Sequence, residues 1–140
     1  EDAMAQYMAY HAAQFARIME VLDRIPEGDG SLLDNTVVVW MSELADSWHG
    51  MDQYPVVLGG GKNSRLQTGQ YVNYARTSPR RGLKPYDDTS PFMGVPHQKL
   101  LTTLCEGVGM APPALGVSQV RGDNGETIDC TGNLPELLKG

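Results

Sequence analysis

Residues 32–61 have the sequence LLDNTVVVWMSELADSWHGMDQYPVVLGGG, in which two apolar runs flank a polar loop. The runs cover residues 36–41 and 55–58. Continuous apolar runs are typical of strands that are covered on both faces, as in the parallel sheets of α/β proteins. We therefore predict an α/β fold with a mostly parallel sheet flanked by helices, in which residues 36–41 and 54–58 form neighbouring buried strands.

The loop between the two runs carries Glu43, Asp46, His49 and Asp52. Open α/β sheets place their ligand sites outside the carboxyl ends of strands, which is where these side chains would lie. Carboxylates and imidazole are ligands for divalent metals such as zinc, manganese and calcium. Two interpretations stay open, a divalent metal site and a solvated loop between strands.

Length and composition predict one globular domain. The chain has 140 residues, of which 41% are hydrophobic and 20% are charged. A formal net charge of −6 and a pI near 4.9 argue against nucleic acid or an anionic membrane as the main partner. No apolar run approaches the ~18 residues that suggest a membrane span. The chain begins with Glu1 instead of Met, so we expect a piece of a longer protein.

Two helices are predicted, over residues 2–25 and residues 97–108. The first has one apolar stripe at i, i+3, i+4 and i+7 spacing, and we expect this stripe to pack on the sheet. His11 lies on the stripe and is expected to be a core residue. The stripe consists of Met4, Tyr7, Met8, His11, Phe15, Ile18, Met19, Leu22 and Ile25. Pro26 and the glycines after it end the helix.

Three further features each allow two interpretations. Residues 59–61 and Lys62 form a glycine-rich loop, which we interpret as a tight turn because the Walker spacing of a phosphate loop is missing. Within the irregular residues 74–96, the basic run could meet an anionic group or form a solvated patch; it consists of Arg76, Arg80, Arg81 and Lys84. Cys105 and Cys130 are either unpaired thiols or, in an oxidising compartment, a disulfide.

Together these segments resemble the last third of one bacterial exported family of unknown function. The family is named for a His-x-x-Ser-His-His motif and belongs to the alkaline phosphatase and sulfatase-like superfamily. The naming motif itself is missing from this chain, and Ser47-Trp48-His49 is not a version of it. The resemblance rests on residues 30–36, 42–44, 49, 55–60, 68–71, 96–101, 107–110 and 132–137.

The resemblance implies an alkaline phosphatase-like α/β fold, of which residues 1–140 would be a C-terminal fragment. It also implies export to the periplasm or the extracellular space. In the superfamily, an Asp-His pair at the end of a comparable strand binds metal and a later His completes the site. Here the pair is Glu43-Leu44, and His49 matches the later His only by order. Glu43 and His49 would then be the metal ligands, with Asp46 or Asp52 as a third.

Two classes of function follow from the resemblance. The first is the C-terminal portion of a metal-dependent phosphatase or sulfatase-like hydrolase, which is expected to be inactive alone because the half with the nucleophile is missing. The second is a non-catalytic binding or structural module that kept the fold and lost the metal site. In both cases an incomplete sheet would expose strand edges. We therefore expect association with a second copy or with the missing N-terminal part.

Overall fold

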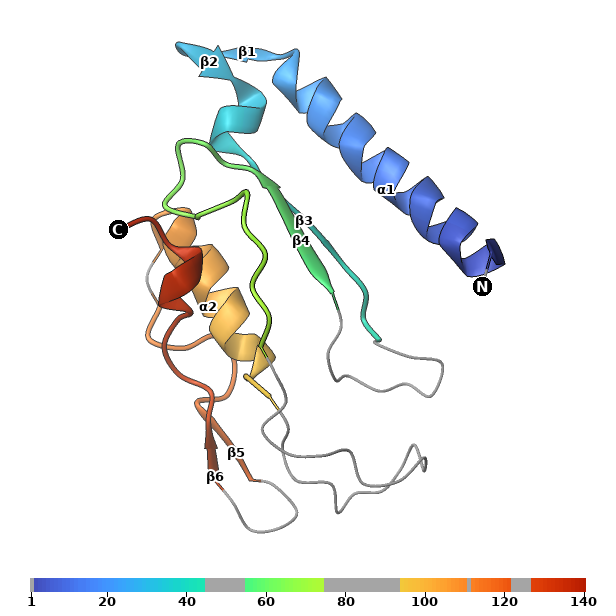
Figure 1. Cartoon of the computed structure of the whole chain (residues 1–140). Coiled ribbons are helices and arrows are strands. Elements are labelled where there is room, and N and C mark those ends of the chain that lie inside the picture. Colours follow the sequence, from blue (N-terminus) through green and yellow to red (C-terminus); the bar gives the residue numbers. More distant parts are fainter. Residues whose placement is uncertain (1, 45–54, 75–93, 111, 122–126) are drawn as a thin grey trace. The chain divides into compact units, whose positions relative to one another are not determined.

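In a computed structural model of the chain, the residues described are 2–44, 55–74, 94–110, 112–121 and 127–140 (Figure 1). The chain divides into two compact units. The first contains residues 1–40 and 57–64, and the second contains residues 41–56 and 65–140. Each unit is described by itself.

The first unit begins with helix α1, Asp2–Asp23. Six alanines favour the helical state, because alanine loses no side-chain entropy there. Asp2 places a negative charge in the first turn, where the helix dipole favours it. The helix ends shortly before Pro26, whose ring disfavours the helical conformation of the preceding residue. The predicted helix is therefore confirmed, with its end two residues earlier than expected.

A small hairpin reverses the chain after α1. Strand β1, Pro26–Glu27, pairs antiparallel with strand β2, Gly30–Ser31. Gly28 occupies the turn at φ 60°, a conformation that glycine adopts without steric cost. The 3₁₀ helix η1, Leu32–Asn35, follows immediately and leads into the strands.

Strands β3, Val37–Met41, and β4, Val56–Gly60, form the third element of the first unit. They pair with each other in a two-stranded sheet, as the sequence predicted, but the pairing is antiparallel. All three sheets of the described residues are two-stranded and antiparallel, so the predicted parallel, alkaline phosphatase-like α/β fold is wrong. An antiparallel pair needs only a reversal of the chain, whereas a parallel pair needs a crossover connection.

The prediction that β3 and β4 are buried on both faces is also wrong. Most residues of β3 are half-buried, and β4 alternates between half-buried and exposed over its first three residues. In a two-stranded sheet both strands are edges, so an apolar run such as Val37–Val39 cannot be enclosed by neighbours on both sides. Apolar content therefore overstated how deeply these strands are buried.

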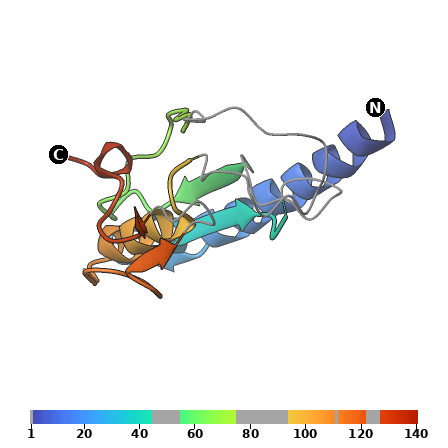
Figure 2. The same cartoon turned by 90° about the horizontal axis from the view of Figure 1, so that it is seen from below.

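Helix α1 packs along the β3–β4 hairpin, which confirms the expected contact between helix and strands (Figures 1 and 2). The ring centroids of Phe15 and Trp40 lie 5.9 Å apart. A Cβ atom at Gly59 would lie 2.3 Å from Sδ of Met19 and 3.1 Å from Cζ of Phe15. Gly59 therefore allows the helix to approach the backbone of β4 closely.

The second unit is built around helix α2, His97–Gly107, as the sequence predicted. Strands β5, Gln119–Arg121, and β6, Thr127–Asp129, form an antiparallel hairpin in the register Val120 to Ile128. The 3₁₀ helix η2, Pro135–Leu137, lies near the C-terminus. The backbone of residues 65–67 hydrogen-bonds to Gly107, Leu137 and Lys139, so this segment joins α2 to the end of the chain.

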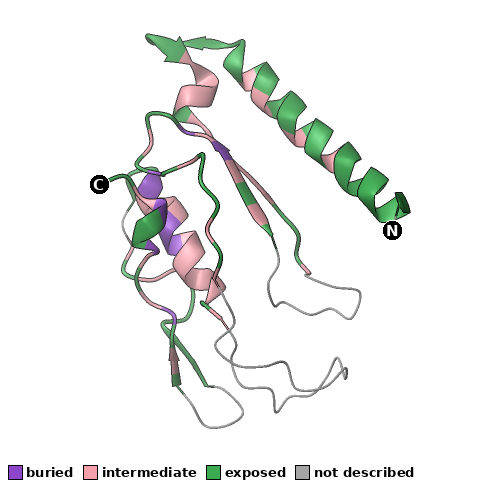
Figure 3. Cartoon of the chain, in the orientation of Figure 1, coloured by how far each residue is buried: buried purple, intermediate pink, exposed green. Residues whose placement is uncertain are grey.

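The core that the described residues of the second unit form is small, and most of it lies against α2 (Figure 3). Its fully buried side chains are Leu66, Thr103 and Cys130, and Leu134 and Leu137 extend it. A Cβ atom at Gly107 would lie 2.4 Å from Cγ of Leu66, so the glycine provides the space in which Leu66 is buried. This contact fixes the distance between residues 65–67 and the last turn of α2.

Candidate functional site

The structure places one of the four predicted metal ligands. Glu43 lies just beyond the end of β3, exposed, in a short turn that is closed by the Leu44 N–H donating to Oγ of Ser42 at 3.3 Å. Asp46, His49 and Asp52 lie outside the described residues. The metal site formed by Glu43 and His49 therefore stays a prediction.

No other metal site can be drawn from the residues that the structure describes, since none of their His, Cys, Asp and Glu side chains gather in groups of three or more that could hold an ion. Cys105 is half-buried and Cys130 is buried, and both are free thiols. Of the two interpretations of this pair, the structure has unpaired thiols. The basic run of Arg76, Arg80, Arg81 and Lys84 lies outside the described residues.

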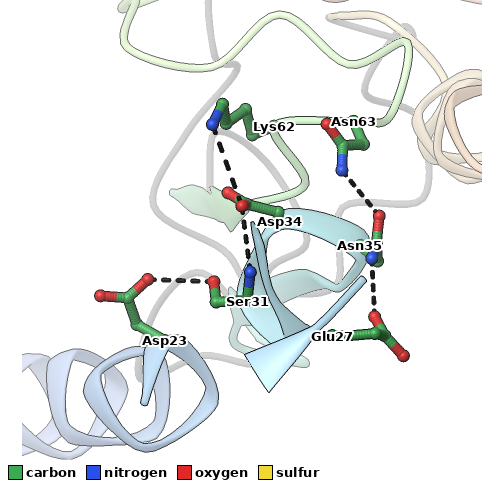
Figure 4. Close-up of polar contacts among 7 residues, drawn as sticks. All are labelled: Asp23, Glu27, Ser31, Asp34, Asn35, Lys62 and Asn63. Atoms are coloured by element: carbon green, nitrogen blue, oxygen red, sulfur yellow. Dashed lines mark hydrogen bonds and ion pairs between the residues drawn. The ribbon is translucent and has the colours of Figure 1, made fainter. Parts of the chain in front are cut away.

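A polar network in the first unit joins the end of α1 to the segment after β4 (Figure 4). Asp34 is its centre. Its carboxylate accepts a hydrogen bond from the Ser31 N–H at 3.2 Å and lies 3.9 Å from Nζ of Lys62. The Ser31 hydroxyl donates in turn to Asp23 at 3.0 Å. Lys62 is 78% exposed at its side chain, so its ion pair with Asp34 contributes little to stability.

Asn35 forms the second branch of this network. Its amide donates to the Glu27 carboxylate at 2.7 Å, and its oxygen accepts from the Asn63 amide at 2.9 Å (Figure 4). The backbone N–H of Asn63 also donates to the Asp34 carbonyl at 2.8 Å. Because these polar groups are hydrogen-bonded to one another, we interpret the network as structural. It holds η1 between the β1–β2 hairpin and residues 61–64.

The glycine-rich loop at the end of β4 is a tight turn, as predicted. Gly60 and Gly61 have φ angles of 73° and 64°. The Gly61 N–H donates to the Leu33 carbonyl at 2.9 Å, so this donor is already used within the chain. A Cβ atom at Gly60 would lie 2.4 Å from the Thr36 carbonyl oxygen, which requires glycine at this position.

Polar contacts in the second unit join α2 to the segments around it. The Glu106 carboxylate accepts a hydrogen bond from the Arg65 guanidinium at 3.0 Å and a second, short one from the Asn133 side-chain amide. Nζ of Lys99 donates to the Thr131 carbonyl at 2.5 Å and lies 3.6 Å from the Asp129 carboxylate. Hydrogen bonds from the hydroxyl and the backbone N–H of Thr131, with the charge of Lys99, lower the pKa of Asp129. Each of these charged groups already has a partner within the chain, so we interpret the contacts as structural.

Helix α1 exposes most of its surface (Figure 3). None of its residues is fully buried. The side that faces the hairpin, which we call the packed stripe, consists of the half-buried residues His11, Phe15, Met19 and Leu22. The tyrosine rings around His11 make edge contacts with it, with centroid distances of 4.4 Å for Tyr7 and 5.5 Å for Tyr10.

A second stripe lies about 100° around the helix from the packed stripe, since each residue rotates the helix by about 100°. We call it the open stripe, and it consists of Tyr7, Tyr10, Gln14, Ile18 and Val21. The exposed fractions are 60% for Tyr7, 61% for Tyr10 and 51% for both Ile18 and Val21. Sequence reasoning placed Tyr7 and Ile18 on the same stripe as Phe15 and so missed this division. The signal was the width of the apolar arc, which exceeds what one sheet contact can cover.

In comparisons with protein-family models, curated proteins and solved structures, the chain matches none of them. The resemblance to the His-x-x-Ser-His-His family therefore stays a prediction. None of the helices within the described part of the chain is long and apolar enough to cross a membrane.

Proposed function

We propose that this chain is a non-catalytic binding module that presents the open stripe of α1 to another protein surface. The observation that supports the proposal is the exposure of Tyr7, Tyr10, Ile18 and Val21 on one side of one helix, at 51–61% each. Single exposed apolar residues are ordinary on protein surfaces, whereas contiguous apolar patches mark interaction sites.

The residue types of the open stripe suit a protein interface. Tyrosine is enriched at such interfaces because its ring is rigid and apolar while its hydroxyl stays compatible with water. When an amphipathic helix binds in a groove or against another helix, its contacting residues recur along one side at spacings such as i, i+3, i+4 and i+7. Tyr7, Tyr10, Gln14 and Ile18 lie at i, i+3, i+7 and i+11, which places them along one side of a helix whose neighbouring side already packs on β3 and β4.

The hydrolase interpretation has no supporting observation of its own. Glu43 stands alone at the end of β3 among the described residues, and the remaining three predicted ligands lie outside them. The fold that the resemblance implied is not the fold found. Hydrolase activity, export and a bound zinc, manganese or calcium ion therefore remain predictions from the resemblance.

Isothermal titration calorimetry separates the two functions. Zinc, manganese and calcium are each titrated into the wild-type chain and into the variants Glu43→Gln and His49→Ala. The binding module predicts that neither substitution changes the heat of any metal titration. Tight binding of one metal that both substitutions weaken by ~10-fold or more would overturn the proposal, because losses of that size mark residues in or next to a metal site.

A further inference from the structure

We propose that the partner of the open stripe is a second copy of this chain, whose α1 lies antiparallel to the first across a two-fold axis at Gln14. The inference rests on the proposed function and names its partner. A two-fold axis creates an interface in which the same surface serves both copies, so that surface must be complementary to itself. The open stripe has this property in its spacing and its residue types.

The spacing of the open stripe is the same in both directions from Gln14. Tyr10 and Ile18 lie four residues to either side of Gln14, and Tyr7 and Val21 lie seven residues to either side. An antiparallel partner centred at Gln14 therefore places Tyr10 of one copy opposite Ile18 of the other, and Tyr7 opposite Val21. Each pair joins an aromatic side chain to a branched aliphatic one, and the two amides of Gln14 meet at the axis.

A shallow, open depression lies on this side of α1. Its lining consists of Leu22 of the packed stripe and four residues of the neighbouring side, Gln14, Arg17, Ile18 and Val21, and its volume is about 340 Å³. Positions i, i+3, i+4 and i+7 form the hole that receives a knob in helix-to-helix packing, and these four residues have that spacing. The side chain that arrives there from an antiparallel partner is Tyr10, whose ring would also face the Arg17 guanidinium as a cation–π contact.

One pair of opposite charges, Asp2 and Arg24, lies near the two ends of α1, beside the acidic residues Glu20 and Asp23 of the last turn. Asp2 lies in the first turn, and Arg24 directly follows the last helical residue. With the axis at Gln14, Asp2 of one copy comes close to Arg24 of the other. Arg24 is 79% exposed and its partner within the chain, Glu20, lies 3.8 Å away and is 66% exposed, so the guanidinium can contact a second carboxylate.

The size of the interface predicts a weak dimer. A helix of 22 residues is about 33 Å long, and one helix-to-helix contact of that length buries on the order of 1,000 Å² in total, at the low end for specific interfaces. We therefore expect a dissociation constant in the micromolar range, from roughly 10 to 500 µM.

Sedimentation equilibrium with two complementary variants tests the arrangement. Ile18→Lys places a charge opposite Tyr10, and Tyr10→Glu places one opposite Ile18, so each variant alone has two mismatched pairs in its dimer. We expect each to weaken self-association by at least about ten-fold, as loss of a central contact does. In an equimolar mixture, the mixed dimer has one Glu–Lys pair and one native Tyr–Ile pair. The mixture is therefore expected to associate at concentrations where each variant alone is monomeric.

The matched control is Ala9→Lys, which adds the same charge on an exposed position away from both stripes. It is expected to leave self-association unchanged. Self-association that survives Ile18→Lys, or a mixture no stronger than its components, would overturn the antiparallel arrangement.

A wild-type chain that stays monomeric up to about 500 µM would overturn the second copy as partner. That result is distinct from failure of the proposed function. The proposed function fails if Ile18→Lys lowers the stability of the monomer, because the stripe would then be covered by the chain itself.

Discussion

The backbone N–H of Leu134 donates to the Thr103 hydroxyl at 2.8 Å, and that hydroxyl donates in turn to the Lys99 carbonyl at 2.6 Å. Thr103 is fully buried, so one side chain joins α2 to the segment before η2 inside the core. Thr103→Val keeps the shape and removes both hydrogen bonds. We expect it to lower the free energy of unfolding by about 1–3 kcal/mol, because a buried N–H loses its acceptor. Urea denaturation measures this change.

The neighbouring residue provides a matched control. Thr102 is also buried, at 3% exposure, but its hydroxyl oxygen has no hydrogen-bond partner among the described residues. Thr102→Val therefore removes a polar atom that was buried without compensation, and we expect unchanged or higher stability. Equal losses for the two variants would contradict this account of the core.

Gly107 is predicted to tolerate no side chain. The added methyl of Gly107→Ala would lie 2.4–2.9 Å from three carbon atoms of Leu66, whose side chain is 1% exposed and cannot move aside. Overpacking of this kind costs about 1–3 kcal/mol, which exceeds the gain in helix propensity of at most about 1 kcal/mol. Thermal unfolding of Gly107→Ala and of Gly94→Ala provides the comparison. A Cβ at Gly94 would meet nothing within 4 Å, so that variant should be as stable as the wild type.

The raised pKa of Tyr74 predicts that the folded chain loses stability at alkaline pH. Burial raises the pKa of the Tyr74 phenol above its ordinary value of 10.0, and the adjacent carboxylate of Glu136 raises it further. Above pH 10 the unfolded chain ionises this phenol while the folded chain does not. The contribution to stability is therefore complete below pH 10 and is lost as the pH rises toward the folded pKa.

The measurement is the unfolding free energy of wild type and Tyr74→Phe between pH 7 and about pH 11, since that range brackets the ordinary pKa of tyrosine. The wild type should lose more stability over this range than the variant. Parallel curves for the two proteins would show that Tyr74 titrates normally in the folded chain.

The helices were predictable from the sequence because their signals are local. Alanines and apolar spacing define α1, Pro26 limits its end, and His97–Gly107 has both a clear apolar face and terminal glycines. The direction of pairing between β3 and β4 was not predictable in this way. The apolar runs of a parallel and an antiparallel pair can look alike, and the difference lies in the path of the intervening chain.

The candidate surface was only partly visible in the sequence. The apolar residues of α1 were identified, but which of them contact β3 and β4 depends on the short width of a two-stranded sheet. Phe15 and Met19 reach the hairpin, whereas Tyr10 and Ile18 lie around the helix from it. The metal hypothesis depended on a loop, and loop positions follow from the fold that surrounds them.

The central claim is that the open stripe of α1 serves another protein surface and not the interior of this chain. The most direct test is the free energy of unfolding of Ile18→Lys at about 1 µM, below the concentration at which a micromolar dimer forms. Phe15→Ala on the packed stripe is the control and should lose at least about 1.5 kcal/mol, since part of its ring contact with Trp40 is removed. Ile18→Lys is expected to match the wild type within about 0.5 kcal/mol, as exposed substitutions do. A loss of about 2 kcal/mol or more for Ile18→Lys would contradict the account, because only a covered site makes a charge that costly.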